Sequence, residues 1–91
     1  MQEFEWDAAK ARRNGRRHGV RFTEAASVFA DPLARSMVDP AHSELEDRYV
    51  ITGTSDRGRV LVVVYTEREH TIRIINAHRA TRRERRTYEE G

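Results

Sequence analysis

The sequence contains no cysteine among its 91 residues. Disulfide bonds, thiolate nucleophiles, zinc fingers and iron–sulfur clusters are therefore excluded. The sequence also lacks any apolar run near the roughly 18 residues of a membrane-spanning helix, and acids and arginines fill the N-terminal segment where a signal peptide would be apolar. We therefore expect a cytoplasmic protein that does not associate with membranes.

Lysine is nearly absent, because 16 of the 17 Lys+Arg residues are arginine. The net charge of +2 hides two basic blocks: residues 10–21 hold six basic residues and no acid, and residues 73–86 hold six arginines and one acid. Because the planar guanidinium group binds phosphate through two hydrogen bonds and stacks on bases, this bias favours a polyanion such as RNA. Arginine enrichment in a high-GC genome explains the count equally well.

Large apolar side chains are scarce too, since hydrophobic residues make up 37% of the chain and aromatic residues 8%. A chain of this length forms one small domain that buries about 60 to 65% of its unfolded surface. We therefore predict a single domain over residues 1–91, of modest stability.

The first third of the chain has a mostly helical pattern. Alternation favours a short strand at Phe4–Trp6, and Asp7 caps a helix over Ala8–His18. Thr23 is expected to cap a second short helix, which Asp31-Pro32 ends. The inner stripe of the first helix is predicted to be Ala8, Ala11, Gly15 and His18.

The pattern then changes to a period of two, which is typical of strands. A polar loop is expected at Asp39–Asp47, and the strands are predicted at Arg35–Val38, Tyr49–Thr54, Arg59–Thr66 and Thr71–His78. Thr81 and Glu84 form a capping box that opens a last helix, which runs to about Glu90. Its only sizeable apolar side chain is Tyr88, so the helix must be held by Tyr88, by a partner or by a ligand.

The last strand carries the strongest candidate site. Strand alternation is expected to place Arg73 and Arg79 on one face, and Asn76 and His78 on the other. Two arginines on one face suit a phosphodiester, because they can neutralise the charge that gathers on phosphorus during cleavage.

The N-terminus of the last helix adds backbone N–H groups and a positive dipole end near this strand. Arg82 and Arg83 add charge there. RNA brings its own nucleophile, the 2′-hydroxyl, so neither a metal ion nor a cofactor is predicted.

Acid–base partners are fewer. His78 is the best candidate, because imidazole titrates near neutrality. The alternative interpretation of His78 is a strand-end residue that only forms hydrogen bonds with solvent. His42 and Glu46 are four apart and would hold a metal only in a helix, which the predicted loop makes unfavourable. Other candidate helpers are Tyr65, Tyr88, Glu46, Glu67 and His18. Core packing is an alternative role for Tyr65, and a structural imidazole near the end of the first helix is the alternative for His18.

Several segments of the chain form a recognisable pattern by their order and spacing. The main ones are Phe4-x-Trp6-Asp7, His18-Gly19-Val20-x-Phe22, Val28-Phe29-x-Asp31-Pro32, Val64-Tyr65-Thr66-Glu67-Arg68 and Arg73-Ile74-Ile75. In this pattern the chain resembles the BrnT family of ribonuclease toxins from bacterial type II toxin–antitoxin systems, and the resemblance covers nearly the whole chain.

The resemblance implies a RelE-like α+β fold and a metal-independent ribonuclease that blocks translation. We accordingly expect an antiparallel sheet of three to four strands, with N-terminal helices packed on it and a basic C-terminal helix. A BrnA-like antitoxin is the implied partner, in a toxin–antitoxin hetero-oligomer, and the ribosome is a further candidate. The family commonly reads Arg-Ile-Ile-Ser-Ala-Arg, whereas Asn76 and His78 stand in place of that serine and second arginine.

These observations give one main hypothesis, an endoribonuclease that uses the 2′-hydroxyl of its RNA substrate. Arg73 and Arg79 are expected to bind the scissile phosphate, and His78 or Glu46 to accept the 2′-hydroxyl proton. Tyr88 is expected to position a base or the leaving group. The predicted RNA-binding residues are Arg48, Tyr65, Arg82 and Arg83. The alternative is a non-catalytic basic module that binds an antitoxin or a nucleic acid without cutting it.

Overall fold

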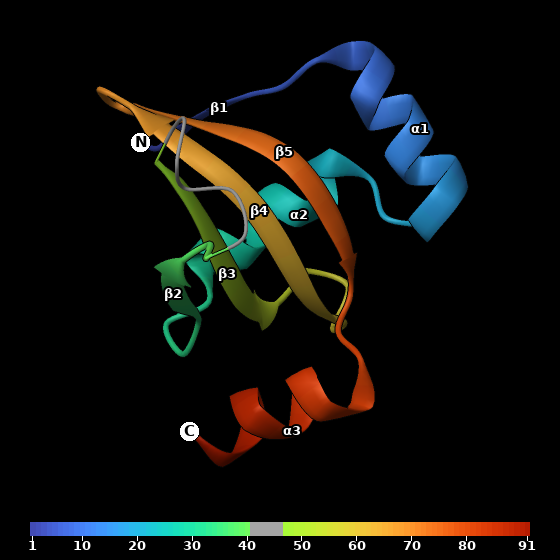
Figure 1. Ribbon diagram of the computed structural model, residues 1–91, viewed down its shortest axis with the longest axis vertical. Helices are drawn as coiled ribbons and strands as arrows, with labels where there is room; N and C mark the ends of the chain where they lie inside the picture. The colour runs from blue at the N-terminus through green and yellow to red at the C-terminus, as the bar shows by residue number, and fades with distance from the viewer. Residues whose placement is uncertain (41–46) are drawn as a thin grey trace.

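The computed structural model describes residues 1–40 and 47–91. Its centre is a five-stranded sheet in the order β1-β5-β4-β3-β2 (Figure 1). All neighbouring strands are antiparallel except β1 and β5, which are parallel. The strands are β1 (Glu3–Glu5), β2 (Arg35–Val38), β3 (Arg48–Thr54), β4 (Val60–Arg68) and β5 (Thr71–Arg79).

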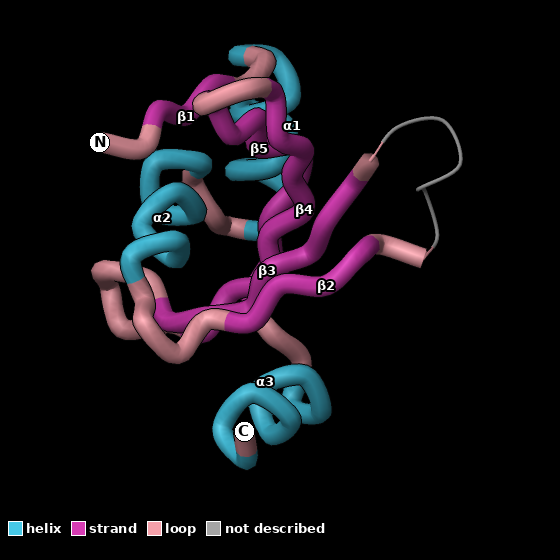
Figure 2. Tube along the Cα trace, turned by 90° about the vertical axis from the view of Figure 1, so that its left-hand side faces the viewer, coloured by secondary structure: helices cyan, strands magenta, loops and turns pink. Residues whose placement is uncertain are grey.

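Three α-helices surround the sheet: α1 (Ala8–His18), α2 (Phe22–Ser27), which continues into a 3₁₀ turn at Val28–Ala30, and α3 (Arg82–Glu90). Figures 1 and 2 show α2 on one face of the sheet and α1 and α3 at opposite ends of the molecule. None of these helices is long and apolar enough to span a membrane within the described residues.

The predicted bounds of α1 and α3 are confirmed, and both predicted caps are present. The side chain of Asp7 accepts the Lys10 N–H, and Gly19 ends α1 with a φ of 69°, which glycine adopts without strain. The prediction that Thr23 caps α2 is wrong, because α2 starts at Phe22 and its N-cap residue is Arg21, which makes no side-chain capping bond.

The α+β class is confirmed, whereas the expectation of a fully antiparallel sheet of three to four strands is wrong. Residues Glu3–Glu5 add a fifth strand, which pairs in parallel with Thr71–Arg73. Alternation revealed this segment as a strand, but its partner lies near the other end of the chain and is fixed by tertiary packing. The expected packing of both N-terminal helices on the sheet also needs correction, because α1 contacts β5 at the side of the sheet and only α2 covers its face.

A β-bulge in β5 decides which of its residues share a face. Tyr65 pairs with Ile74 and Val64 with Asn76, so Ile75 is the extra residue. We call the side packed against α2 the core face; from β4 and β5 it carries Leu61, Val63, Tyr65, Ile72, Ile74, Ala77 and Arg79. We call the other side the second face; from β3, β4 and β5 it carries Arg48, Val50, Thr52, Thr54, Val62, Val64, Thr66, Arg73, Asn76 and His78.

The hydrophobic core lies between the core face and α2. Phe22, Ala25 and Val28 pack against the buried strand residues, and Val20 joins them from the loop before α2. Aromatic rings extend this core, since Phe29 makes an edge contact with Tyr65 and a tilted contact with Phe4. This packing fixes β4 and β5, from which the candidate site is built.

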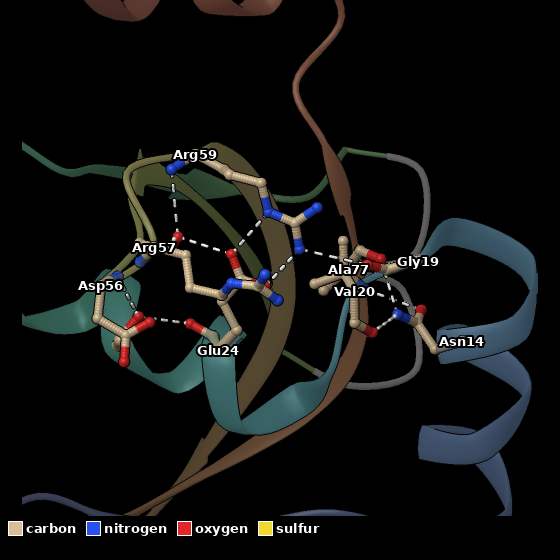
Figure 3. Close-up of polar contacts among 10 residues, drawn as sticks. Asn14, Gly19, Val20, Glu24, Asp56, Arg57, Arg59 and Ala77 are labelled. Carbon is tan, nitrogen blue, oxygen red and sulfur yellow. Dashed lines mark hydrogen bonds and ion pairs between the residues drawn. The ribbon is translucent and has the colours of Figure 1, made fainter.

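Asn14 ties α1 to β5 and is the buried residue of this helix, at 7% exposure. Its amide nitrogen donates to the carbonyl oxygens of Val20 (3.0 Å) and Ala77 (2.9 Å), and its oxygen accepts the Ala77 N–H (3.1 Å), as Figure 3 shows. The predicted inner stripe therefore missed the residue that matters most, while Ala8, which it included, is exposed.

A second buried polar group joins α2 to the turn between β3 and β4. The Glu24 carboxylate accepts hydrogen bonds from the Arg59 guanidinium and the Ser55 hydroxyl (Figure 3). Arg59 also donates to the carbonyl oxygen of Gly19. The hydrogen bond from Arg59, and then that from Ser55, lowers the pKa of Glu24 despite its burial.

Replacement of Asn14 by alanine is expected to lower the free energy of unfolding by about 3 kcal/mol, because three buried backbone groups lose their partners. Urea unfolding followed by circular dichroism measures this loss. Asn76→Ala is the matched control: it removes the same amide from an exposed position, and the expected change is below about 0.5 kcal/mol. Equal effects of the two substitutions would contradict the role of Asn14.

Acidification is expected to destabilise the fold through Glu24. Its folded pKa lies below the ordinary 4.5, so its contribution is complete above the unfolded pKa and is lost as the pH falls through the folded pKa. The melting temperature should fall as the pH drops below about 5, and Glu24→Gln should reduce this dependence. Glu89→Gln, at an exposed position of α3, should keep the wild-type pH dependence.

Candidate active site

The second face carries an open groove of about 340 Å³. It lies where β3, β4 and β5 meet the start of α3. The lining residues are Asp39, Arg48, Val50, Val62, Val64, Ile75, Asn76, His78 and Glu84. We call this the second-face groove. Its valines form an apolar floor, and its polar groups are the ones that can act on a substrate.

His78 and Glu84 form the central polar pair of this groove. His78 Nε2 lies 3.3 Å from Glu84 Oε1. The same carboxylate accepts the Thr81 N–H as part of the capping box that starts α3. Burial raises the pKa of Glu84, but the hydrogen bonds from Thr81 and His78 outweigh burial and leave its pKa below the usual value.

This contact assigns the tautomer of His78. An ionised carboxylate only accepts hydrogen bonds, so Nε2 of His78 must carry the hydrogen and donate it to Glu84. The other ring nitrogen, Nδ1, is then the basic atom of the neutral imidazole. The geometry therefore gives His78 an oriented ring with one nitrogen able to accept a proton.

A second imidazole lies beside the first. The ring centroids of His18 and His78 are 6.1 Å apart. His18 is the last residue of α1, and the hydrogen bonds between Asn14 and Ala77 hold that helix against β5 next to His78. Two imidazoles at this separation can serve as the base and the acid of one proton-transfer reaction.

The prediction that Arg73 and Arg79 share a face is wrong. Arg73 pairs with Thr66 on the second face, whereas Arg79 pairs with Leu61 on the core face. The extra residue at Ile75 breaks the simple alternation on which the prediction relied. Arg73 also forms an ion pair with Glu5 of β1, with 2.6 Å between Nη1 and Oε2.

The two tyrosines of the predicted site have structural contacts. Tyr65 is 4% exposed, packs against Phe29, and donates its hydroxyl hydrogen to Ser36, so its ring has little free surface on which a base could stack. Burial raises the pKa of Tyr65. Its predicted role in RNA binding therefore gains no support from its position.

Tyr88 anchors α3 to the sheet. Its hydroxyl donates to the Asp31 carboxylate and lies 3.0 Å from Thr54 Oγ1. The bond to Asp31 raises the pKa of Tyr88, and Asp31, which also accepts the Thr54 N–H, has a lowered pKa. Arg35 adds a hydrogen bond to the carbonyl oxygen of Gly91. Of the three ways to hold this helix that the sequence left open, Tyr88 provides one.

The remaining predicted residues occupy different places. Arg48 lines the second-face groove, and Arg82 and Arg83 are exposed in the first turn of α3 beside it. The capping box already supplies acceptors for two N–H groups at this helix start, so part of the expected anion site is filled by the protein itself. Glu46 and His42 lie outside the described residues.

Glu84 and His18 are the site residues that sequence reasoning undervalued. Glu84 was interpreted as a helix cap, and it performs that role while it also binds His78. The sequence predicts His18 on the inner stripe of the first helix and only as a possible acid–base helper, and the docking of α1 brings it to His78. Across residues 1–40 and 47–91, no three His, Asp or Glu side chains gather closely enough to hold a metal ion.

Comparisons with known proteins give a family match and a structural match. A family model described as "Ribonuclease toxin, BrnT, of type II toxin-antitoxin system" matches residues 6–84. No curated protein sequence matches significantly. The crystal structure of the Brucella abortus ribonuclease toxin BrnT matches with a TM-score of 0.66 and 16% sequence identity, over 90% of this chain and 100% of that chain. This similarity shows the same fold.

Replacement of Tyr88 by phenylalanine is expected to loosen α3, because it removes the hydroxyl that binds Asp31 and Thr54. The expected loss is about 1 kcal/mol, with faster hydrogen–deuterium exchange of the amides of residues 82–90. Tyr49→Phe removes a hydroxyl that makes no hydrogen bond within the described residues and serves as the matched control. Unchanged exchange in Tyr88→Phe would show that other contacts hold α3.

Proposed function

The chain belongs to the BrnT family of ribonuclease toxins of type II toxin–antitoxin systems, and we propose that it is a metal-independent endoribonuclease that inhibits translation by cleaving RNA. One observation carries the proposal: the imidazole of His78 contacts Glu84 and lies beside that of His18 at a groove on the second face. This arrangement supplies an oriented base and a second proton-transfer group without a metal ion.

The reaction begins with the 2′-hydroxyl of the RNA. His78 Nδ1 accepts the proton of this hydroxyl while the 2′-oxygen forms a bond to phosphorus. The bond between phosphorus and the 5′-oxygen breaks, and His18, in its protonated form, donates a proton to that oxygen. The products are a 2′,3′-cyclic phosphate and a 5′-hydroxyl. Glu84 orients His78 and stabilises the imidazolium ion that forms.

Charge on the phosphate needs positive partners in the same place. Of the predicted RNA-binding residues, Arg48 lines the groove, and Arg82 and Arg83 flank it on α3. Asn76 offers an amide that can donate to a phosphate oxygen or to a base. Arg73 and Arg79 remain candidates as substrate contacts outside the reacting centre, because they lie on opposite faces.

The family implies an antitoxin as partner. We propose a BrnA-like antitoxin that forms a hetero-oligomer with this chain, with RNA, free or on the ribosome, as the substrate. A cytoplasmic location follows from that substrate. The non-catalytic binding module remains the alternative, and the absence of cleavage by folded protein would favour it.

The decisive measurement is cleavage of a defined single-stranded RNA by antitoxin-free protein in the presence of EDTA. We expect cleavage by the wild type, a fall in kcat of at least about a hundredfold in His78→Gln, and a similar direction of change in His18→Gln. Glu84→Gln keeps the capping box, since glutamine also serves at this position, while it removes the charge that supports His78.

His70→Gln is the matched control for these variants, because His70 is exposed in the turn between β4 and β5 and lies outside the groove. Analysis of the RNA ends gives an independent check. Fragments with 3′-hydroxyl ends, or cleavage that stops in EDTA, would refute the mechanism. Full activity of His78→Gln would remove His78 from it.

A further inference from the structure

A second groove, between α1 and β5, is lined by four cationic side chains and lies near the candidate site. Its volume is about 560 Å³. We call it the α1–β5 groove. The side chains that matter are Lys10, Arg13, Arg16 and Arg17 on α1, and Ile75 and Asn76 on β5. We propose that this groove binds the phosphate backbone of single-stranded RNA and delivers the strand to His78; the proposal rests on the ribonuclease function proposed above.

The cations of this groove are available to a ligand. No carboxylate lines the groove, and among the described residues none of its four cations forms an ion pair. A cluster of like charges disfavours itself by repulsion, so it gains free energy when it binds an anion. Arginine predominates, and its guanidinium group matches phosphate oxygens with two hydrogen bonds.

The spacing of these cations suits a polyanion. Lys10, Arg13 and Arg17 follow one another by three and four residues, so they share one face of α1 at steps of about 4.5 and 6 Å along its axis. These steps are comparable with the distance between successive phosphates of a nucleic-acid strand. Ile75 and Asn76, opposite them, offer an apolar surface and an exposed amide to a sugar or a base.

The second-face groove needs this additional charge. Its permanent cation, Arg48, shares the groove with the imidazole of His78 and with two carboxylates, those of Asp39 and Glu84. Arg73 is engaged by Glu5, and Arg79 lies on the core face. The groove with the reacting groups therefore has no excess of positive charge, and affinity for the RNA backbone must arise next to it.

The two grooves share a boundary. Ile75 and Asn76 line both of them, because the bulge in β5 turns these two successive residues toward the second face. His18 belongs to the α1–β5 groove and His78 to the second-face groove, and their rings lie next to each other. A strand bound along α1 therefore meets both imidazoles as it leaves the groove. This continuity favours RNA over an acidic protein as the occupant.

The test uses a labelled single-stranded RNA with 2′-O-methyl groups at every position, which this protein cannot cleave through the 2′-oxygen. Its affinity is measured by fluorescence anisotropy over a series of salt concentrations. Arg13→Gln/Arg17→Gln should weaken binding about tenfold and lower the slope of log K against log salt by about 1.4, or 0.7 for each lost phosphate contact. With unmodified RNA, the effect should fall on KM.

Arg12→Gln/Arg21→Gln is the matched control. It removes the same charge from two exposed residues that line a different hollow, beside Trp6 and Phe22, and its effect on RNA affinity should stay below about twofold. Equal weakening by both pairs, or wild-type affinity of the Arg13/Arg17 variant, would overturn the proposal. So would a loss of affinity for a polyglutamate peptide with RNA affinity retained, since the groove would then bind acidic protein.

These outcomes are separable from the ribonuclease proposal. If the wild type binds the modified RNA through Arg13 and Arg17 but never cleaves unmodified RNA, RNA binding by the α1–β5 groove is supported and the catalytic mechanism is refuted. If the wild type cleaves RNA and the Arg13/Arg17 variant keeps the wild-type affinity and KM, the catalytic mechanism is supported and RNA binding by the α1–β5 groove is refuted.

Discussion

One buried amide holds the parts of the candidate site in register. β1 pairs with only the first three residues of β5. Further along the same edge, the side chain of Asn14 on α1 forms hydrogen bonds with both the N–H and the carbonyl group of Ala77. Buried hydrogen bonds of this kind fix direction as well as distance, and they are costly to leave unmade. Because His18 lies one turn after Asn14, and His78 directly follows Ala77, the spacing of the two imidazoles depends on a residue that is neither of them.

The bulge at Ile75 is the second constraint, because it lets one strand serve two surfaces. Before the bulge, Ile72 and Ile74 point into the core, and after it Ala77 does so. Arg73, Ile75 and Asn76, which lie between these residues, are on the second face. In a regular strand of this length the side chains would alternate between the two faces without a break, and Asn76 would lie on the same face as Ile74. The extra residue keeps the core packed and also presents Asn76 and His78 side by side with Arg48 in a groove.

Local signals in the sequence predicted the elements well, because caps and periodicity act over a few residues. Asp7, Gly19 and the Thr81–Glu84 box define helices that the structure contains. The faces of β5 were mispredicted, because a bulge depends on pairing with β4 and leaves no local pattern. The same reasoning explains Asn14, which looks like an ordinary polar helix residue until its partners, six and 63 positions away, are known.

The residue at position 78 explains why the proposed function assigns binding and proton transfer to different surfaces. The family that the sequence resembles commonly has an arginine at this point, which is a permanent charge, whereas a histidine is charged only when protonated. A neutral imidazole held by Glu84 is a good base but a poor clamp for phosphate. The fixed charge that position 78 lacks must come from elsewhere, and α1 carries it along the neighbouring groove. Glu84 fits this division, because a carboxylate beside the reacting phosphate is unfavourable for substrate affinity but strengthens the imidazole as a base.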